Sequence, residues 1–136
     1  MTNFNPKQPI IKSIFHDDKN PKSLSFNNTR STFIDHNNVV WVCTYGGGLN
    51  RFTGNLEKNE ITFQHYMHQD NANSLSSDFV FNITQDNNNT YWVATENGLN
   101  KLEFTNNDYN QPVFTNFLEM NQTKTVSTAM LFYQLL

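Results

Sequence analysis

The chain has 136 residues, of which 37% are hydrophobic and 15% are charged, and its formal net charge is −3 at pH 7. This length suits one ordinary domain, and the weakly acidic balance argues against nucleic acid or an anionic membrane surface as a partner. The single cysteine, Cys43, excludes an internal disulfide. The polar opening residues lack the apolar core of a signal peptide, and the apolar stretch at 129–136 is too short to span a bilayer.

Taken in chain order, the predicted elements begin after a loose polar segment at residues 1–9. Residues 10–15 fit the last strand of a preceding unit. A first full unit is expected to follow, with strands at 30–34, 39–44, 49–53 and 60–66. A second unit is expected to have strands at 79–84, 90–95, 99–104 and 112–118. Asp/Asn clusters and glycines separate these strands, and no segment shows helical periodicity over ten residues. The predicted fold class is therefore all-β.

The two units repeat one another along the sequence. Trp41 and Trp92 are 92 − 41 = 51 residues apart, and Asp35 and Asp86 have the same spacing. The glycine turn of the second unit is one residue shorter, so the motif Gly-Leu-Asn recurs after 50 residues. The residues that define the repeat are Trp41, Thr44, Gly48, Leu49, Asn50, Asp86, Trp92, Thr95, Gly98, Leu99 and Asn100. Four strands in about 50 residues predict one blade of a β-propeller, a four-stranded antiparallel sheet.

The register of the repeat sets the expected domain boundaries. The repeats are expected over residues 10–127, with full blades at approximately 23–67 and 74–118. Residues 128–136 are expected to form a partial or aberrant first strand of a further blade. Because closed propellers contain roughly 4–8 blades, the sequence predicts an incomplete propeller, a fragment of a larger protein or a truncated product. Such a chain is expected to self-associate through exposed blade faces.

The pattern of Ser-Leu-Ser, strand, Asp turn, Trp-Val-x-Thr and Gly-Leu-Asn resembles the two-component regulator propeller repeat. Residues 74–102 (SLSSDFVFNITQDNNNTYWVATENGLNKL) carry the resemblance most fully, and residues 23–52 repeat it. The family usually has Gly before the Thr of the second strand, where this chain has Cys43 and Ala94. The resemblance implies the sensor region of a large periplasmic hybrid histidine kinase of the kind found in Bacteroidetes. It also implies a glycan or related cue, with the remaining blades and kinase domains supplied by a parent chain.

Ligand sites in closed propellers commonly lie at the mouth of the central channel. The family topology places the hairpins at 45–47 and 96–97 there, with Arg30 entering from an innermost strand. The candidate ligand-binding residues are therefore Arg30, Tyr45, Gly46, Glu96 and Asn97. The expected ligand is a small molecule or an oligosaccharide. The alternative is that these are solvated loop residues.

The remaining conspicuous residues favour structural roles. Trp41 and Trp92 are expected to pack between blades because large rings on a sheet face bury much area, and Cys43 is expected to be a small buried hydrophobe. His65 and His68 are predicted to point to opposite faces of a strand, which disfavours a shared metal.

The Asp-x-Asn-x-Thr sequence at 86–90 lacks the glycine and the acidic residue that a calcium loop needs at its sixth and twelfth positions. No catalytic group, metal or cofactor is predicted. A protein-binding scaffold and part of a propeller glycosidase or lyase are the rival functions.

Overall fold

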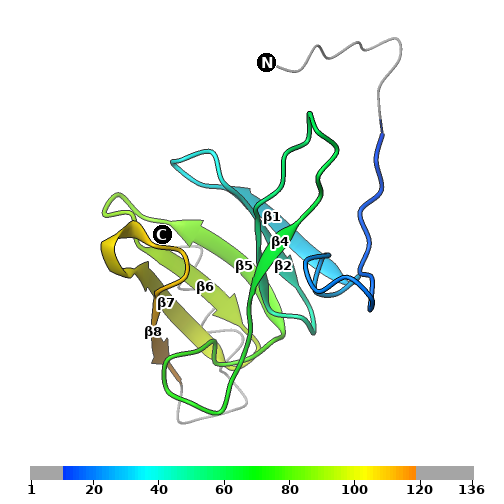
Figure 1. Ribbon diagram of the computed structural model, residues 1–136. Helices are drawn as coiled ribbons and strands as arrows, with labels where there is room; N and C mark the ends of the chain where they lie inside the picture. The colour runs from blue at the N-terminus through cyan, green and yellow to red at the C-terminus, as the bar shows by residue number, and fades with distance from the viewer. Residues whose placement is uncertain (1–10, 119–136) are drawn as a thin grey trace.

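The computed structural model describes residues 11–118, in which eight strands form two four-stranded antiparallel sheets (Figure 1). In each sheet the strands lie in chain order, so each sheet is a simple meander. The first sheet contains β1 (Thr29–Ile34), β2 (Val40–Thr44), β3 (Leu49–Phe52) and β4 (Phe63–Tyr66). The second contains β5 (Val80–Gln85), β6 (Tyr91–Thr95), β7 (Gly98–Phe104) and β8 (Pro112–Phe117). The fold is all-β, as predicted, and the sheets correspond to two propeller blades that do not close into a ring.

The two sheets repeat even in their irregularities. In the first sheet, the register between β1 and β2 shifts between Thr29 and Ser31. The second sheet has the same shift between β5 and β6, at Val80 and Asn82, which are each 51 residues later. A β-bulge of this kind bends a strand and increases its twist. The repeat in the sequence is therefore a repeat of backbone geometry.

The hairpin glycines are required by backbone conformation. Gly48 directly precedes β3 and Gly98 begins β7, with φ angles of 76° and 98°, a region that favours glycine. A Cβ atom added to Gly98 would lie 2.5 Å from the carbonyl oxygen of Phe117 on the neighbouring strand, and one added to Gly48 would clash with the carbonyl oxygen of Tyr66. Both the turn and the close strand approach therefore exclude a side chain.

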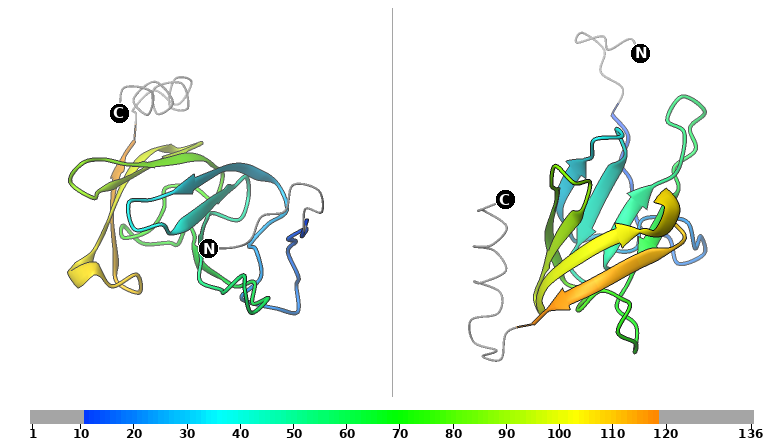
Figure 2. Two further views of the ribbon diagram at one scale, coloured as in Figure 1. Left: turned by 90° about the horizontal axis from the view of Figure 1, so that it is seen from above. Right: turned by 90° about the vertical axis from the view of Figure 1, so that its left-hand side faces the viewer.

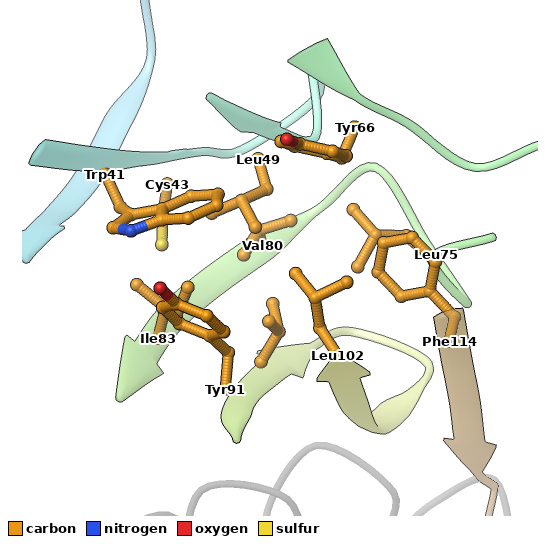
Figure 3. Close-up of a cluster of buried hydrophobic side chains, with 11 residues drawn as sticks. Trp41, Cys43, Leu49, Tyr66, Leu75, Val80, Ile83, Tyr91, Leu102 and Phe114 are labelled. Carbon is orange, nitrogen blue, oxygen red and sulfur yellow. The ribbon is translucent and has the colours of Figure 1, made fainter. Parts of the chain in front are cut away.

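The main core lies between the two sheets, whose strands β1 and β2 contact β5 (Figures 1 and 2). The first sheet contributes four buried residues to this core: Trp41, Cys43, Leu49 and Tyr66. The second blade contributes Val93 and the side chains that point toward them in Figure 3: Leu75, Val80, Ile83, Tyr91, Leu102 and Phe114. Burial of this apolar surface is the main force that holds the blades together.

Three expected strands need correction or stay open. Residues 11–15 form no strand, because Lys12 stands where later units have phenylalanine and instead hydrogen-bonds through its ammonium group to the Asn59 side chain. The predicted strand at 60–66 is shorter and begins at Phe63. The predicted partial strand at 128–136 lies outside the described residues. In the part of the chain that the structure describes, no helix is long and apolar enough to cross a membrane.

Candidate functional site

An aspartate–tryptophan pair organises the turn between the first two strands of each blade. The carboxylate of Asp35 accepts the Trp41 indole N–H at 2.9 Å and the backbone N–H groups of Asn37 and Val39 at 2.8 and 3.0 Å. Asp86 does the same for Trp92, at 2.9 Å, and for the backbone of the 86–90 turn. The carboxylate thereby satisfies turn N–H groups that the sheet leaves without partners.

Asp35 also binds the second blade. Its Oδ2 accepts a hydrogen bond from the hydroxyl group of Tyr91, on β6, at 2.7 Å. Burial on its own raises the pKa of Asp35, but the bonds from Trp41, Tyr91 and the turn backbone outweigh burial and leave the pKa lowered. Burial and the Asp35 carboxylate together raise the pKa of Tyr91. Asp35 therefore remains ionised and Tyr91 neutral, and the bond between them links the two blades.

A second polar cluster fixes the Ser-Leu-Ser segment to each blade. Asn100 is fully buried, and its Oδ1 accepts the Ser76 backbone N–H at 2.9 Å while its Nδ2 donates to Ser76 Oγ at 2.8 Å. Thr95 completes the cluster with hydroxyl contacts to Ser76 (2.9 Å) and to the Gly98 carbonyl (3.0 Å). The first blade builds the same cluster from Ser25, Thr44, Gly48 and Asn50. The Thr and Asn of the repeat motif therefore have a structural role.

Three of the predicted ligand-binding residues lie together at the exposed end of the interface between the blades. The Arg30 guanidinium carbon lies 4.5 Å from the centre of the Tyr45 ring, a cation–π arrangement. The Tyr45 hydroxyl is 3.5 Å from Glu96 Oε1, on the hairpin of the other blade. Residues from two blades thus form a row of cation, aromatic ring and carboxylate.

The other two predicted residues have local bonds. The Gly46 backbone N–H donates to the Asp78 carbonyl at 3.1 Å, and the Asn97 side chain donates to the Ser76 carbonyl at 3.3 Å. Gly46 therefore contributes backbone geometry rather than a ligand-binding side chain. Asn97 and Glu96 line an open depression of about 470 Å³ with five further residues: His68, Ser76, Ser77, Asp78 and Phe79.

The sequence prediction missed the aromatic support of this cluster. Phe79 lies with its ring 4.7 Å from that of Tyr45 in an edge-on arrangement, and the Phe81 ring lies at 5.6 Å. A short bridge also pairs Tyr45 with Phe79 between the blades. The alternation of Phe79 and Phe81 at the start of a strand places both on one face, which was the available signal. Their meeting with Tyr45 depends on the packing of the blades.

Comparison with known families places the repeat. The model of the two component regulator propeller matches residues 74–97, which contain the Ser-Leu-Ser segment, β5, the Asp86 turn and β6. Residues 74–97 are thus similar to a two component regulator propeller repeat. The first blade has the same Asp–Trp pair and Ser–Thr–Asn cluster, at spacings of 51 residues for Asp, Trp, Ser and Thr and 50 for Asn, so the structural unit that contains the matched residues occurs twice. No curated protein matches the chain.

Proposed function

We propose that this chain is a ligand-sensing segment of the propeller in a periplasmic two-component sensor. The propeller repeat itself is non-catalytic, and signal output would come from kinase domains of a parent protein. The single observation that carries the proposal is the row of Arg30, Tyr45 and Glu96, in which a regulator propeller presents polar and aromatic groups from two blades at one exposed end. A ligand there would contact both blades and thereby report on their arrangement.

Charge indicates the class of ligand. Among the described residues, Arg30 has no carboxylate within ion-pair distance and its side chain is exposed. The guanidinium group keeps its paired N–H donors, whose geometry suits a carboxylate or a sulfate. Tyr45 adds a flat apolar face beside it. The proposed ligand is therefore an oligosaccharide that carries an acidic group.

A titration with digalacturonate, a disaccharide with two carboxylates, tests the binding step. Arg30→Ala is expected to weaken binding to the full chain at least tenfold, since a charge-assisted hydrogen bond contributes about 1.5–3 kcal/mol. Lys58→Ala, which removes the same charge from an exposed loop residue, is the matched control and should leave binding unchanged. Equal affinities of Arg30→Ala and the parent chain would refute the site.

The signalling role has a separate test. The coding DNA that adjoins this chain is expected to encode a transmembrane segment and a histidine kinase in the same reading frame. Adjoining DNA that encodes further blades without a kinase would favour a scaffold instead.

A further inference from the structure

A second depression lies at the opposite end of the blade interface. The Arg30–Tyr45–Glu96 row stands beside the hairpin that joins β2 to β3, whereas this depression adjoins the turns that join β1 to β2 and β5 to β6. Its volume is about 630 Å³, within the range of small-molecule sites. Both blades contribute to it, along with the loop between β7 and β8. The lining residues are Asn37, Gln85, Asn88, Asn89, Thr90, Tyr91, Glu103, Phe104, Asn107 and Tyr109.

The lining is dominated by side-chain amides. Among the hydrogen bonds between described residues, the amide groups of Asn37, Asn88 and Asn107 have no partner. Gln85 uses its oxygen to accept the His36 backbone N–H at 2.8 Å, which leaves its NH₂ group available. Each free amide offers a donor and an acceptor. The depression therefore presents amide donors and acceptors from three turn residues and from Gln85 at the end of β5.

The frame that holds these amides is ordered by the aspartates already described. Asn37 and Asn88 donate their backbone N–H groups to Asp35 and Asp86, both at 2.8 Å. Asn107 belongs to the turn η1 (Thr105–Asn107), where its φ angle is 58°. The backbones of Asn37 and Asn88 are thus held in place before any ligand binds, which lowers the entropic cost of binding.

Aromatic rings form one side of the depression. Phe104 stacks on Trp41 with ring centres 6.2 Å apart, and Tyr109 meets Phe104 edge-on at 5.0 Å. Both rings are only partly buried. The one ionic group in the lining, Glu103, pairs with Lys101 at 3.1 Å. The depression thus combines neutral hydrogen-bonding groups with partly exposed aromatic rings. Because the Glu103 carboxylate is paired with Lys101, a ligand needs almost no charge to complement the site.

We infer that this amide-lined depression is a second binding site, and that its ligand is a neutral, hydroxyl-rich molecule such as an uncharged oligosaccharide. Vicinal hydroxyl groups donate and accept hydrogen bonds at the spacing of a carboxamide, and the apolar face of a sugar ring packs on aromatic carbon. A charged ligand would find no counter-ion here. The inference does not rest on the proposed acidic ligand of the Arg30 row, which lies at the other end of the sheets.

The test is a titration of the isotope-labelled full chain with three uncharged probes, maltotriose, cellotriose and mannotriose, followed by NMR. The side-chain amide signals of Asn37, Asn88 and Asn107 are expected to shift with at least one probe, with a dissociation constant of about 1 mM or tighter. Because no ion pair is involved, the constant should be the same at 0.05 and about 0.5 M salt.

Variants decide whether the amides make the site. Asn88→Ala combined with Asn107→Ala is expected to weaken binding at least about tenfold. Asn87→Ala, which removes an exposed amide from the same turn but outside the lining, is the matched control. Absence of shifts with all three probes, or equal weakening by the control, would overturn the inference. If the chain did not bind an acidic ligand at Arg30, the inference about the amide-lined depression would still stand, so the two proposals can be refuted independently.

Discussion

Asp35 and Asp86 occupy the same place in the repeat but have different surroundings. Both accept an indole N–H and two turn N–H groups. Asp35 is buried and accepts in addition the Tyr91 hydroxyl. In the first blade, Val40 stands where the second blade has Tyr91. The repeat in the sequence therefore predicts the Asp–Trp pair, whereas the bond between blades depends on a position where the two units differ.

This difference predicts unequal costs of neutralising the two carboxylates. Asp35→Asn is expected to lower the free energy of unfolding by about 2–3 kcal/mol. A hydrogen bond to a charged group contributes about 1.5–3 kcal/mol, and the buried donors of Trp41 and Tyr91 would each lose their charged acceptor. Asp86→Asn is the matched control at the equivalent, partly exposed aspartate of the second blade. It is expected to cost about half as much free energy. Urea unfolding measures both values. Equal costs would contradict the role given to Tyr91.

The same aspartates predict an acid-sensitive fold. Burial on its own raises the pKa of Asp86, but the Trp92 indole and the turn backbone outweigh it and lower the pKa, as at Asp35. A carboxylate with a folded pKa below its unfolded value, near about 3.9, stabilises the fold fully above that unfolded value. This stabilisation is lost as the pH falls through the folded pKa. The urea concentration at the unfolding midpoint should therefore decrease when the pH is lowered below about 4. In Asp35→Asn this decrease should be less steep.

Cys43 is expected to be chemically silent in the folded protein. Its side chain is fully buried between the sheets, and burial raises the pKa of its thiol to about 12. Because the thiolate is the reactive form, a thiol reagent such as Ellman's reagent should modify Cys43 only after unfolding. Cys43→Ala should keep the fold, since Ala94 stands at this position in the second blade. Rapid labelling of the native chain would contradict this placement.

At the scale of elements, the hairpin glycines carry the sharpest prediction. Gly98→Val is expected to destabilise the chain by more than about 1 kcal/mol, because valine disfavours a positive φ and its Cβ would meet the Phe117 carbonyl. Gly48→Val should cost a similar amount. Gly46→Val should cost less, because the nearest neighbour of its Cβ is the ring of the exposed Phe26. Thermal melts of the three variants give the order, and equal melting temperatures for Gly98→Val and the parent chain would refute it.

Most strands followed from alternation and turn chemistry, and the exceptions have physical reasons. Every predicted strand from 30 onward is present with shifts of one to three residues at its ends. Of the strand predicted at 10–15, the described residues 11–15 form no strand, because the pattern contains Lys12 and no described partner strand adjoins them. The candidate site was predicted in part, since hairpin position identified Tyr45 and Glu96. Phe79, Phe81 and the amide-lined depression arise from contacts between blades, which one repeat does not contain.

At the scale of the whole molecule, two blades leave apolar side chains exposed. Phe15 is 66% exposed, Ile34 63% and Phe117 50%. Repeat units rely on neighbours to bury such surface, and a closed ring contains roughly 4–8 blades. The isolated 136-residue chain is therefore expected to self-associate at micromolar concentration in sedimentation velocity experiments. A dilute, monodisperse monomer with a cooperative melt would refute this expectation.

Because Tyr91 donates a hydrogen bond to Asp35, the turn of the first blade depends on the second blade. If the second sheet detached, Asp35 would lose a 2.7 Å hydrogen bond and Trp41 would lose the aromatic neighbours Tyr91 and Phe104. Asp86 and Trp92 take none of their described bonds from the first sheet. The Asp35 carboxylate thus depends on the second blade for one of its hydrogen bonds, whereas the 86–90 turn contacts the first blade through the Asn89 side chain, which lies 3.2 Å from His36 Nδ1. Native-state hydrogen exchange should show the amide protons of the 35–39 turn opening whenever β6 opens, while those of the 86–90 turn survive opening of β2.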